Sequence, residues 1–252
     1  MAHSVCVYYF MSNDFWRTTT LIIEHLLLSL SLFSAVIAIL VFLVRKPLRK
    51  YKPIDLGVFD RLSKHVNPRR NKFMLFITLL GKHQFLIPAN LILIAFFLFI
   101  GKHNWFSVRV GAIALSSLAL MFLLKYLFKR KRPLSPLLQS ARGLSFPSGH
   151  AIMAVTFYGL IIYIITHTIN DPVVRYILIA LLIVLIILIG FSRVYLRVHY
   201  ASDVLAGFII GIIWLFISLN VLKKVEEYNS GASQARNTLL NKQNPVVCFL
   251  SF

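Results

Sequence analysis

Acidic residues are scarce in this chain: 8 Asp and Glu stand against 27 Lys and Arg, which gives a formal net charge of +19. Charged residues of either sign make up only 14% of the sequence, whereas hydrophobic residues make up 58%. A soluble domain carries about 25% charged residues and less than about 50% apolar ones. The composition therefore excludes an ordinary soluble domain.

Cysteine is also rare, with only Cys6 and Cys248 at opposite ends of the chain. Their spacing matches no metal-binding or redox motif, and Cys248 lies too far from the last residue for a prenylation box. The first apolar run is too long for the core of a cleaved secretory signal, so we expect none. We find no internal repeat and no second domain.

Long apolar runs dominate what is present. Runs near twenty residues are long enough to cross a bilayer as helices, so we predict an all-α, polytopic membrane bundle of six transmembrane helices. Residues 1–18 would form a short lead, 19–224 the six-span domain and 225–252 a mobile tail. The expected spans are 19–44, 73–100, 105–128, 148–168, 173–194 and 200–222.

The second of these runs is unusually long, and Gly81 and Pro88 interrupt it. Two structures fit this pattern: one tilted and kinked span, or a surface segment followed by the span proper.

The positive charge is concentrated in the loops between the apolar runs, above all in residues 45–72. Within that loop, residues 60–66 could form a short amphipathic helix on the membrane surface. In a soluble protein this charge would suggest nucleic acid as the partner. Here we expect no nucleic acid, and anionic lipid headgroups or phosphate-bearing substrates instead.

Six spans place both termini on one side of the membrane and the loops 45–72, 129–146 and 193–199 on the other. The last of these belongs to a stretch, Ser192–Asp203, with two arginines, a histidine and an aspartate near the membrane boundary, where ionisable groups are costly. If the chain is helical from Tyr200 onward, His199 and Asp203 share one helix face. Asp203 could then hold the imidazole in the tautomer that a nucleophile needs. The simpler alternative is an interfacial basic loop with a helix-capping acid.

Two further polar stretches fall on the same face. Lys125 lies at the end of a helix, and Arg132 lies just beyond it. Ser148, Gly149 and His150 open the fourth span, where free backbone N–H groups at a positive helix end can hold an anion. Each stretch alone could be an ordinary basic flank, a plain helix start or a packed histidine. Together on one face they favour a phosphoryl-transfer site without a metal.

These residues fall into three spaced motifs: Lys-x6-Arg-Pro at 125–133, Pro-Ser-Gly-His at 147–150 and Ser-Arg-x5-His-x3-Asp at 192–203. The set resembles the motifs of the type 2 phosphatidic acid phosphatase (PAP2) family, whose superfamily includes the vanadium haloperoxidases. The resemblance implies that His199 attacks phosphorus, that Asp203 orients it, and that His150 protonates the leaving oxygen and then activates water. It also implies that the phosphate oxygens are bound by Lys125, Arg132, Ser148, Gly149 and Arg193.

A member of this family is expected to be an integral-membrane, metal-independent lipid phosphatase with no cofactor, working through a phosphohistidine. Phosphatidic acid, phosphatidylglycerophosphate, undecaprenyl diphosphate and lipid A phosphates all fit as substrates. Two alternatives remain open: a non-catalytic lipid-binding or transport protein, and a vanadate-dependent haloperoxidase-like enzyme.

The charge count and the resemblance disagree about the side of the membrane. About 19 of the 27 Lys and Arg fall on the motif face, which the positive-inside rule would place in the cytoplasm. Bacterial members of the family are expected to open to the periplasm, and several of these cations are assigned to phosphate. We therefore expect the bacterial inner membrane, with the site facing the periplasm.

Overall fold

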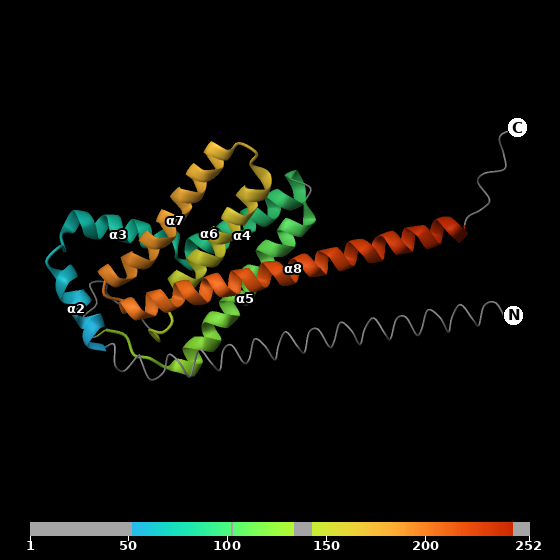
Figure 1. Cartoon of the computed structure of the whole chain (residues 1–252). Helices are drawn as coiled ribbons and strands as arrows, with labels where there is room; N and C mark the ends of the chain where they lie inside the picture. Colours follow the sequence, from blue (N-terminus) through green and yellow to red (C-terminus); the bar gives the residue numbers. More distant parts are fainter. Residues whose placement is uncertain (1–51, 102, 134–142, 244–252) are drawn as a thin grey trace, which may run out of the picture. The chain divides into compact units, whose positions relative to one another are not determined.

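The computed structural model describes residues 52–101, 103–133 and 143–243, and every secondary-structure element in this part of the chain is a helix (Figure 1). The chain divides into two units, residues 1–52 and 53–252, and the helices belong to the second apart from the first residue of α2. The predicted first span, 19–44, lies outside the described residues. The elements are α2 (Lys52–Ser63), α3 (Pro68–Leu80), α4 (His83–Ala95), η1 (Phe96–Ile100), α5 (Asn104–Phe128), α6 (Gly149–Thr168), α7 (Pro172–Tyr195) and α8 (Ala201–Gln243).

Five helical stretches in this part of the chain are long and apolar enough to cross a membrane, which confirms five of the six predicted spans. Their large apolar side chains are widely exposed: on α7, Leu181 is 61% exposed and Ile187 is 54% exposed. Apolar surface on this scale is unfavourable in water, and it indicates contact with lipid. The stretches are His83–Ile100, Asn104–Phe128, Gly149–Thr168, Pro172–Tyr195 and Ala201–Gly231.

The long second run is divided between two helices, α3 and α4, and only the stretch His83–Ile100 is long and apolar enough to span a membrane. Helix α3 begins with Pro68 in its first turn and Asn67 as its N-cap, whose side chain accepts a hydrogen bond from the Arg70 backbone N–H at 2.8 Å. It ends at Leu80 with Gly81 as its C-cap, and α4 starts at His83. The break between α3 and α4 therefore lies at Gly81 and not at Pro88, which is accommodated inside α4.

Helix α6 lies at the centre of the bundle and packs against α5, α7 and α8. Glycines on α8 allow it to approach α6 closely. A Cβ atom at Gly207 would lie 2.8 Å from Ala151 Cβ and 2.9 Å from the Ser148 carbonyl oxygen, and one at Gly211 would lie 2.9 Å from Val155 Cβ. This packing presses the first turn of α8, which carries Asp203, against the start of α6.

Helix α8 is longer than the sequence indicated, because it continues to Gln243. Helix therefore occupies most of the segment predicted as a mobile tail, 225–252, and residues 244–252 lie outside the described part. The expected boundaries at residues 18 and 224 stay predictions.

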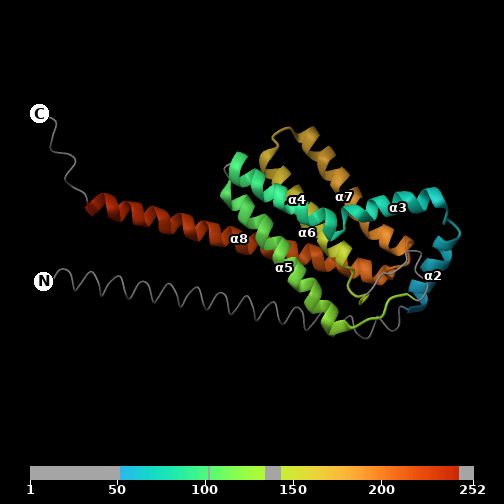
Figure 2. The same cartoon turned by 180° about the vertical axis from the view of Figure 1, so that it is seen from behind.

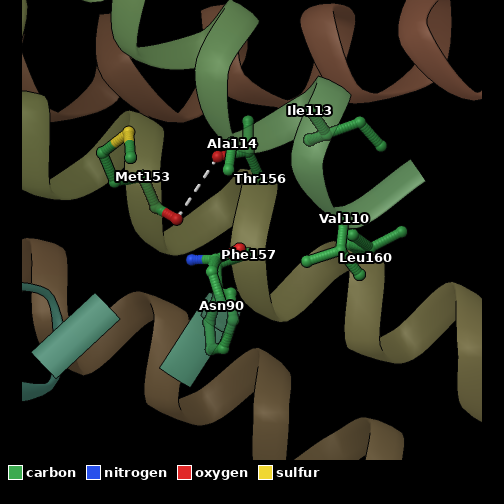
Figure 3. Close-up of a pocket in the computed structure, with 8 residues that line it drawn as sticks. All are labelled: Asn90, Val110, Ile113, Ala114, Met153, Thr156, Phe157 and Leu160. Carbon is green, nitrogen blue, oxygen red and sulfur yellow. Dashed lines mark hydrogen bonds between the residues drawn. The ribbon is translucent and has the colours of Figure 1, made fainter. Parts of the chain in front are cut away.

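A small cavity lies between α4, α5 and α6, lined by apolar side chains together with Asn90 and Thr156 (Figure 3). Both polar side chains bond within their own helices: Asn90 Nδ2 donates to the Leu86 carbonyl at 2.7 Å, and Thr156 Oγ1 donates to the Met153 carbonyl at 3.3 Å. The cavity is a packing gap in the bundle, separate from the polar helix ends where the predicted site residues lie.

We predict that Gly207→Ala destabilises the protein, because the new methyl group would press on a backbone oxygen and a neighbouring Cβ that cannot swing away. Overpacking of this kind costs roughly 1–3 kcal/mol, so thermal unfolding in detergent should occur at a lower temperature. The control is Gly231→Ala on the same helix, where no atom lies within 4 Å of the added Cβ. That change should stabilise α8 by about 0.5–1 kcal/mol. Equal melting temperatures for the two variants would contradict the packing argument.

Candidate active site

The three predicted motif stretches meet at one end of the bundle, where α5 ends, α6 begins and the α7–α8 turn lies. The segment after α5 runs toward α2 in both views of the fold (Figures 1 and 2). Direct hydrogen bonds join the stretches: Arg132 Nη1 donates to the Val198 carbonyl at 3.0 Å, and the Ser148 backbone N–H donates to the Asp203 carbonyl at 3.1 Å. Residues 66 and 55 positions apart in the sequence thus form one cluster.

His199 lies in the short turn between α7 and α8 and is only 2% exposed. Its Nδ1 atom lies 3.6 Å from Oδ2 of Asp203, close enough for an ion pair but longer than a hydrogen bond, and it has no hydrogen-bond partner. Helix α8 starts at Ala201, so Asp203 is in its first turn and His199 precedes it. The expected pairing geometry is present, although the histidine belongs to the turn and not to the helix.

The turn itself is fixed by the backbone of Arg193. The carbonyl oxygen of Arg193 accepts from the backbone N–H groups of Val198 at 3.1 Å and His199 at 3.3 Å. Arg197 closes the turn with a φ of 54°, a left-handed conformation that is uncommon for residues other than glycine. The His199 imidazole and the Arg193 guanidinium are therefore connected through one short, hydrogen-bonded turn.

Burial, the largest influence, lowers the pKa of the His199 imidazole from 6.5 to about 4. Arg132 and Arg193 lower it further, and Asp203 acts in the opposite direction. At neutral pH the ring is therefore unprotonated and keeps a free lone pair, as a nucleophile requires.

The three cations predicted to bind phosphate make hydrogen bonds only to uncharged acceptors, as far as the described residues show. Lys125 Nζ donates to the Leu144 carbonyl at 2.8 Å, Arg132 Nε to the Gly143 carbonyl at 3.1 Å, and Arg193 Nη1 to Thr78 Oγ1 at 2.6 Å. Burial lowers the pKa of Arg132. These contacts position the cations without neutralising them, so the site keeps an excess of positive charge.

Several polar atoms of the predicted site are buried and have no hydrogen-bond partner. They are four of the six such side-chain atoms in the described part of the chain: Ser148 Oγ, His150 Nε2, Arg193 Nε and His199 Nδ1. Buried polar atoms are nearly always satisfied in folded proteins, and exceptions often mark a ligand site. Ser148 illustrates this, because it is the N-cap residue of α6 and yet its side chain does not cap the helix.

His150 follows Gly149 in the first turn of α6 and packs against the turn between α3 and α4. A Cβ atom at Gly81 would lie 3.2 Å from Cδ2 of His150. Arg193, His199 and Arg132 all act on His150 electrostatically. The structure thus brings both histidines and the three predicted cations into one region.

The sequence reasoning missed three polar residues of this region. Arg130 and Ser145 both bond the Asp203 carboxylate, and Asp55, on α2, bonds Arg130. In the sequence, Arg130 is one of four consecutive basic residues, 129–132, and nothing distinguishes it from its neighbours. Acidic residues are scarce, but the basic loop 45–72 contains two aspartates, Asp55 and Asp60, and the sequence does not show which of them meets Arg130.

No group of three or more His, Cys, Asp and Glu side chains is placed to hold a metal ion in residues 52–243 as far as they are described. The cluster is instead made of cations and hydrogen-bond donors around a neutral histidine, which is the composition of an oxyanion-binding site.

Comparison with known proteins agrees with the fold and the motifs. The family model of the PAP2 superfamily matches residues 106–227. Phosphatidylglycerophosphatase B of Bacillus subtilis is 31% identical over 166 residues, covering 64% of this chain and 79% of that protein. An undecaprenyl-diphosphatase of Sulfolobus acidocaldarius is 27% identical over 192 residues, covering 69% of this chain and 85% of that protein.

Two solved structures are similar. The crystal structure of a transmembrane PAP2-type phosphatidylglycerolphosphate phosphatase from Bacillus subtilis gives a TM-score of 0.67 at 29% identity, covering 78% of this chain and 96% of the other. The structure of LpxE from Aquifex aeolicus gives a TM-score of 0.51 at 25% identity, covering 66% and 94%.

The bundle and its motifs define an integral-membrane phosphatase. The chain belongs to the PAP2 superfamily, in its branch of membrane lipid phosphatases.

We predict that the imidazole of His199 titrates near pH 4 in the ligand-free protein, because burial disfavours the charged ring. Histidine-labelled protein in detergent, followed by NMR from pH 3.5 to 8, would measure this, and His199→Gln would identify the signal. Adding inorganic phosphate should raise the midpoint, since an anion stabilises the protonated ring. A midpoint at or above 6.5 without ligand would contradict the prediction.

Proposed function

We propose that the protein hydrolyses the phosphomonoester or diphosphate of a membrane lipid, without a metal ion, through a phosphohistidine on His199. The observation that carries this proposal is the cluster of unneutralised cations and unpartnered polar atoms around a buried, neutral histidine. A phosphate group would supply the missing negative charge and hydrogen-bond acceptors together.

In the first step, His199 attacks phosphorus. With Nδ1 on the side of Asp203, Nε2 is the ring atom available to form the N–P bond while the bond from phosphorus to the leaving oxygen breaks. Asp203 orients the ring and stabilises the positive charge that develops on it. His150 gives its proton to the leaving oxygen.

In the second step, water attacks the phosphohistidine. His150, now unprotonated, takes a proton from the water, the new O–P bond forms, and the bond between phosphorus and Nε2 breaks, which releases phosphate and restores both histidines. Lys125, Arg132, Arg193, Ser148 and the Gly149 N–H would hold the non-bridging oxygens in both steps.

The substrate class follows from the place of the site. It lies where membrane-spanning helices end, so a phosphate head can reach it while an apolar tail stays in the bilayer. The similar proteins are named for phosphatidylglycerophosphate and undecaprenyl diphosphate, and we propose that the substrate is a lipid of this kind. A bacterial inner membrane with the site on the periplasmic face fits such substrates and the family.

We predict that purified protein in detergent releases phosphate from a panel of lipid monophosphates and diphosphates, and that EDTA does not reduce the rate. His199→Ala should abolish turnover, because no nucleophile remains. His150→Ala should lose about 10²–10⁴-fold in kcat, the usual contribution of a general acid–base group. Asp203→Asn should also lower kcat strongly. Phosphate release by a molybdate colour assay measures all four proteins.

Each competing function gives a different result in the same assay. A lipid-binding or transport protein would release no phosphate from any lipid. A haloperoxidase-like enzyme would require vanadate and peroxide for halide oxidation. Release that persists unchanged in His199→Ala would rule out the histidine mechanism.

A further inference from the structure

Arg130 lies in the segment after α5, two residues before the predicted phosphate ligand Arg132, and it contacts two buried carboxylates. Its Nη1 atom is 2.5 Å from Oδ1 of Asp203, and its Nη2 atom is 2.9 Å from Oδ2 of Asp55. The guanidinium also stacks over Tyr200, 4.2 Å from the ring centroid. Asp55 belongs to α2, whereas Tyr200 and Asp203 lie together at the start of α8.

The two carboxylates depend on this arginine. The Asp203 side chain is fully buried and that of Asp55 is 3% exposed, and an unpaired buried charge destabilises a protein strongly. The planar guanidinium can bridge two carboxylates with separate nitrogens, whereas a lysine has a single charged atom. Arg130 therefore suits this position in a way that lysine does not.

Asp55 extends the network to helix α2. Its oxygens accept hydrogen bonds from the backbone N–H of Ser202 at 3.0 Å and from Ser202 Oγ at 2.7 Å. Phe59, one turn later on α2, packs against Tyr200 with ring centroids 5.7 Å apart. Helix α2 is thus fastened to the first turn of α8, which carries Asp203.

We propose that Arg130 is a positioning residue for the reaction: it holds the Asp203 carboxylate beside His199 and ties α2 to the site through Asp55. This inference rests on the proposed function. The charge of Arg130 is offset by two carboxylates, unlike that of Arg132 and Arg193, so it offers little to a phosphate. Its loss should therefore reduce kcat and leave KM nearly unchanged.

Removing Arg130 also changes the charge balance at His199. The charged and titratable groups acting on His199 are Arg132 beyond α5, Arg193 on α7 and Asp203 on α8, with His150 on α6 close by. Without Arg130, no arginine charge offsets the negative charge of the Asp203 carboxylate from the side away from His199. The carboxylate then stabilises the protonated imidazole more strongly. The titration midpoint of His199 should rise in Arg130→Gln.

The experiment compares Arg130→Gln, Arg130→Lys and Asp55→Asn with wild type, measuring kcat, KM and the His199 titration by NMR. We expect Arg130→Gln to lose about 10²-fold in kcat, the size of effect that misplacing a reacting group by about 1 Å produces, with a higher His199 midpoint. Arg130→Lys should be intermediate. Asp55→Asn should lower kcat less and leave the midpoint unchanged, because Arg130 still faces Asp203.

The control is Arg109→Gln. Arg109 is a matched arginine near the opposite end of α5: it is 6% exposed, pairs with Glu226 and lies 5.4 Å from the centroid of Phe106. Its replacement should lower the melting temperature. The protein that remains folded should keep the wild-type KM, kcat and His199 titration midpoint.

The inference is overturned if Arg130→Gln keeps both the kcat and the His199 titration midpoint of wild type. So would a rise in KM with unchanged kcat, which would make Arg130 a phosphate ligand. If Arg130→Gln does not fold, the same criteria apply to Arg130→Lys. If wild type releases no phosphate, the proposed function fails, and the shift of the His199 midpoint still decides whether Arg130 controls the Asp203 carboxylate.

Discussion

The complete burial of the Asp203 carboxylate is the constraint on which the site depends. A charge removed from water is stable only when its partners are in place, and here they come from three regions: Arg130 after α5, Ser145 before α6 and the Tyr200 N–H at the start of α8. Satisfying this one group therefore brings together the ends of the central helices. His199 is the remaining neighbour of this carboxylate, with Nδ1 3.6 Å from Oδ2 of Asp203. The burial of Asp203 therefore also fixes the surroundings of the histidine.

Charge is divided between two sets of arginines. Arg130 faces carboxylates, whereas Arg132 and Arg193 bond a carbonyl and a hydroxyl. With only 8 acidic residues in the chain, few cations can be paired, and the unpaired ones accumulate where a phosphate would enter. Burial, assisted by Arg132 and Arg193, keeps His199 neutral, so the arrangement that would bind the phosphate also prepares the nucleophile.

Close helix packing supplies the rigidity that such a site needs. The glycines of α8 let it approach α6 until the Ser148 N–H bonds the Asp203 carbonyl. Thr78, in the last turn of α3, accepts a hydrogen bond from Arg193 on α7. The reacting groups therefore sit on helix ends and a tight turn, where their positions are set by the bundle itself and a lipid substrate can approach from the bilayer.

The sequence by itself determined the helical membrane class, the positions of five spans and the residues of the three motifs, because apolar runs and motif spacing are local properties of the chain. It could not choose between one kinked helix and two separate helices, since Gly81 and Pro88 can both interrupt a helix, and the break at Gly81 is set where α3 packs against α7. It also gave no sign that α8 continues past residue 225. The partnership of Asp55, Arg130 and Asp203 was decided only by tertiary structure, because it joins residues 75 and 73 positions apart, and no local pattern records which of many basic residues will meet a buried acid.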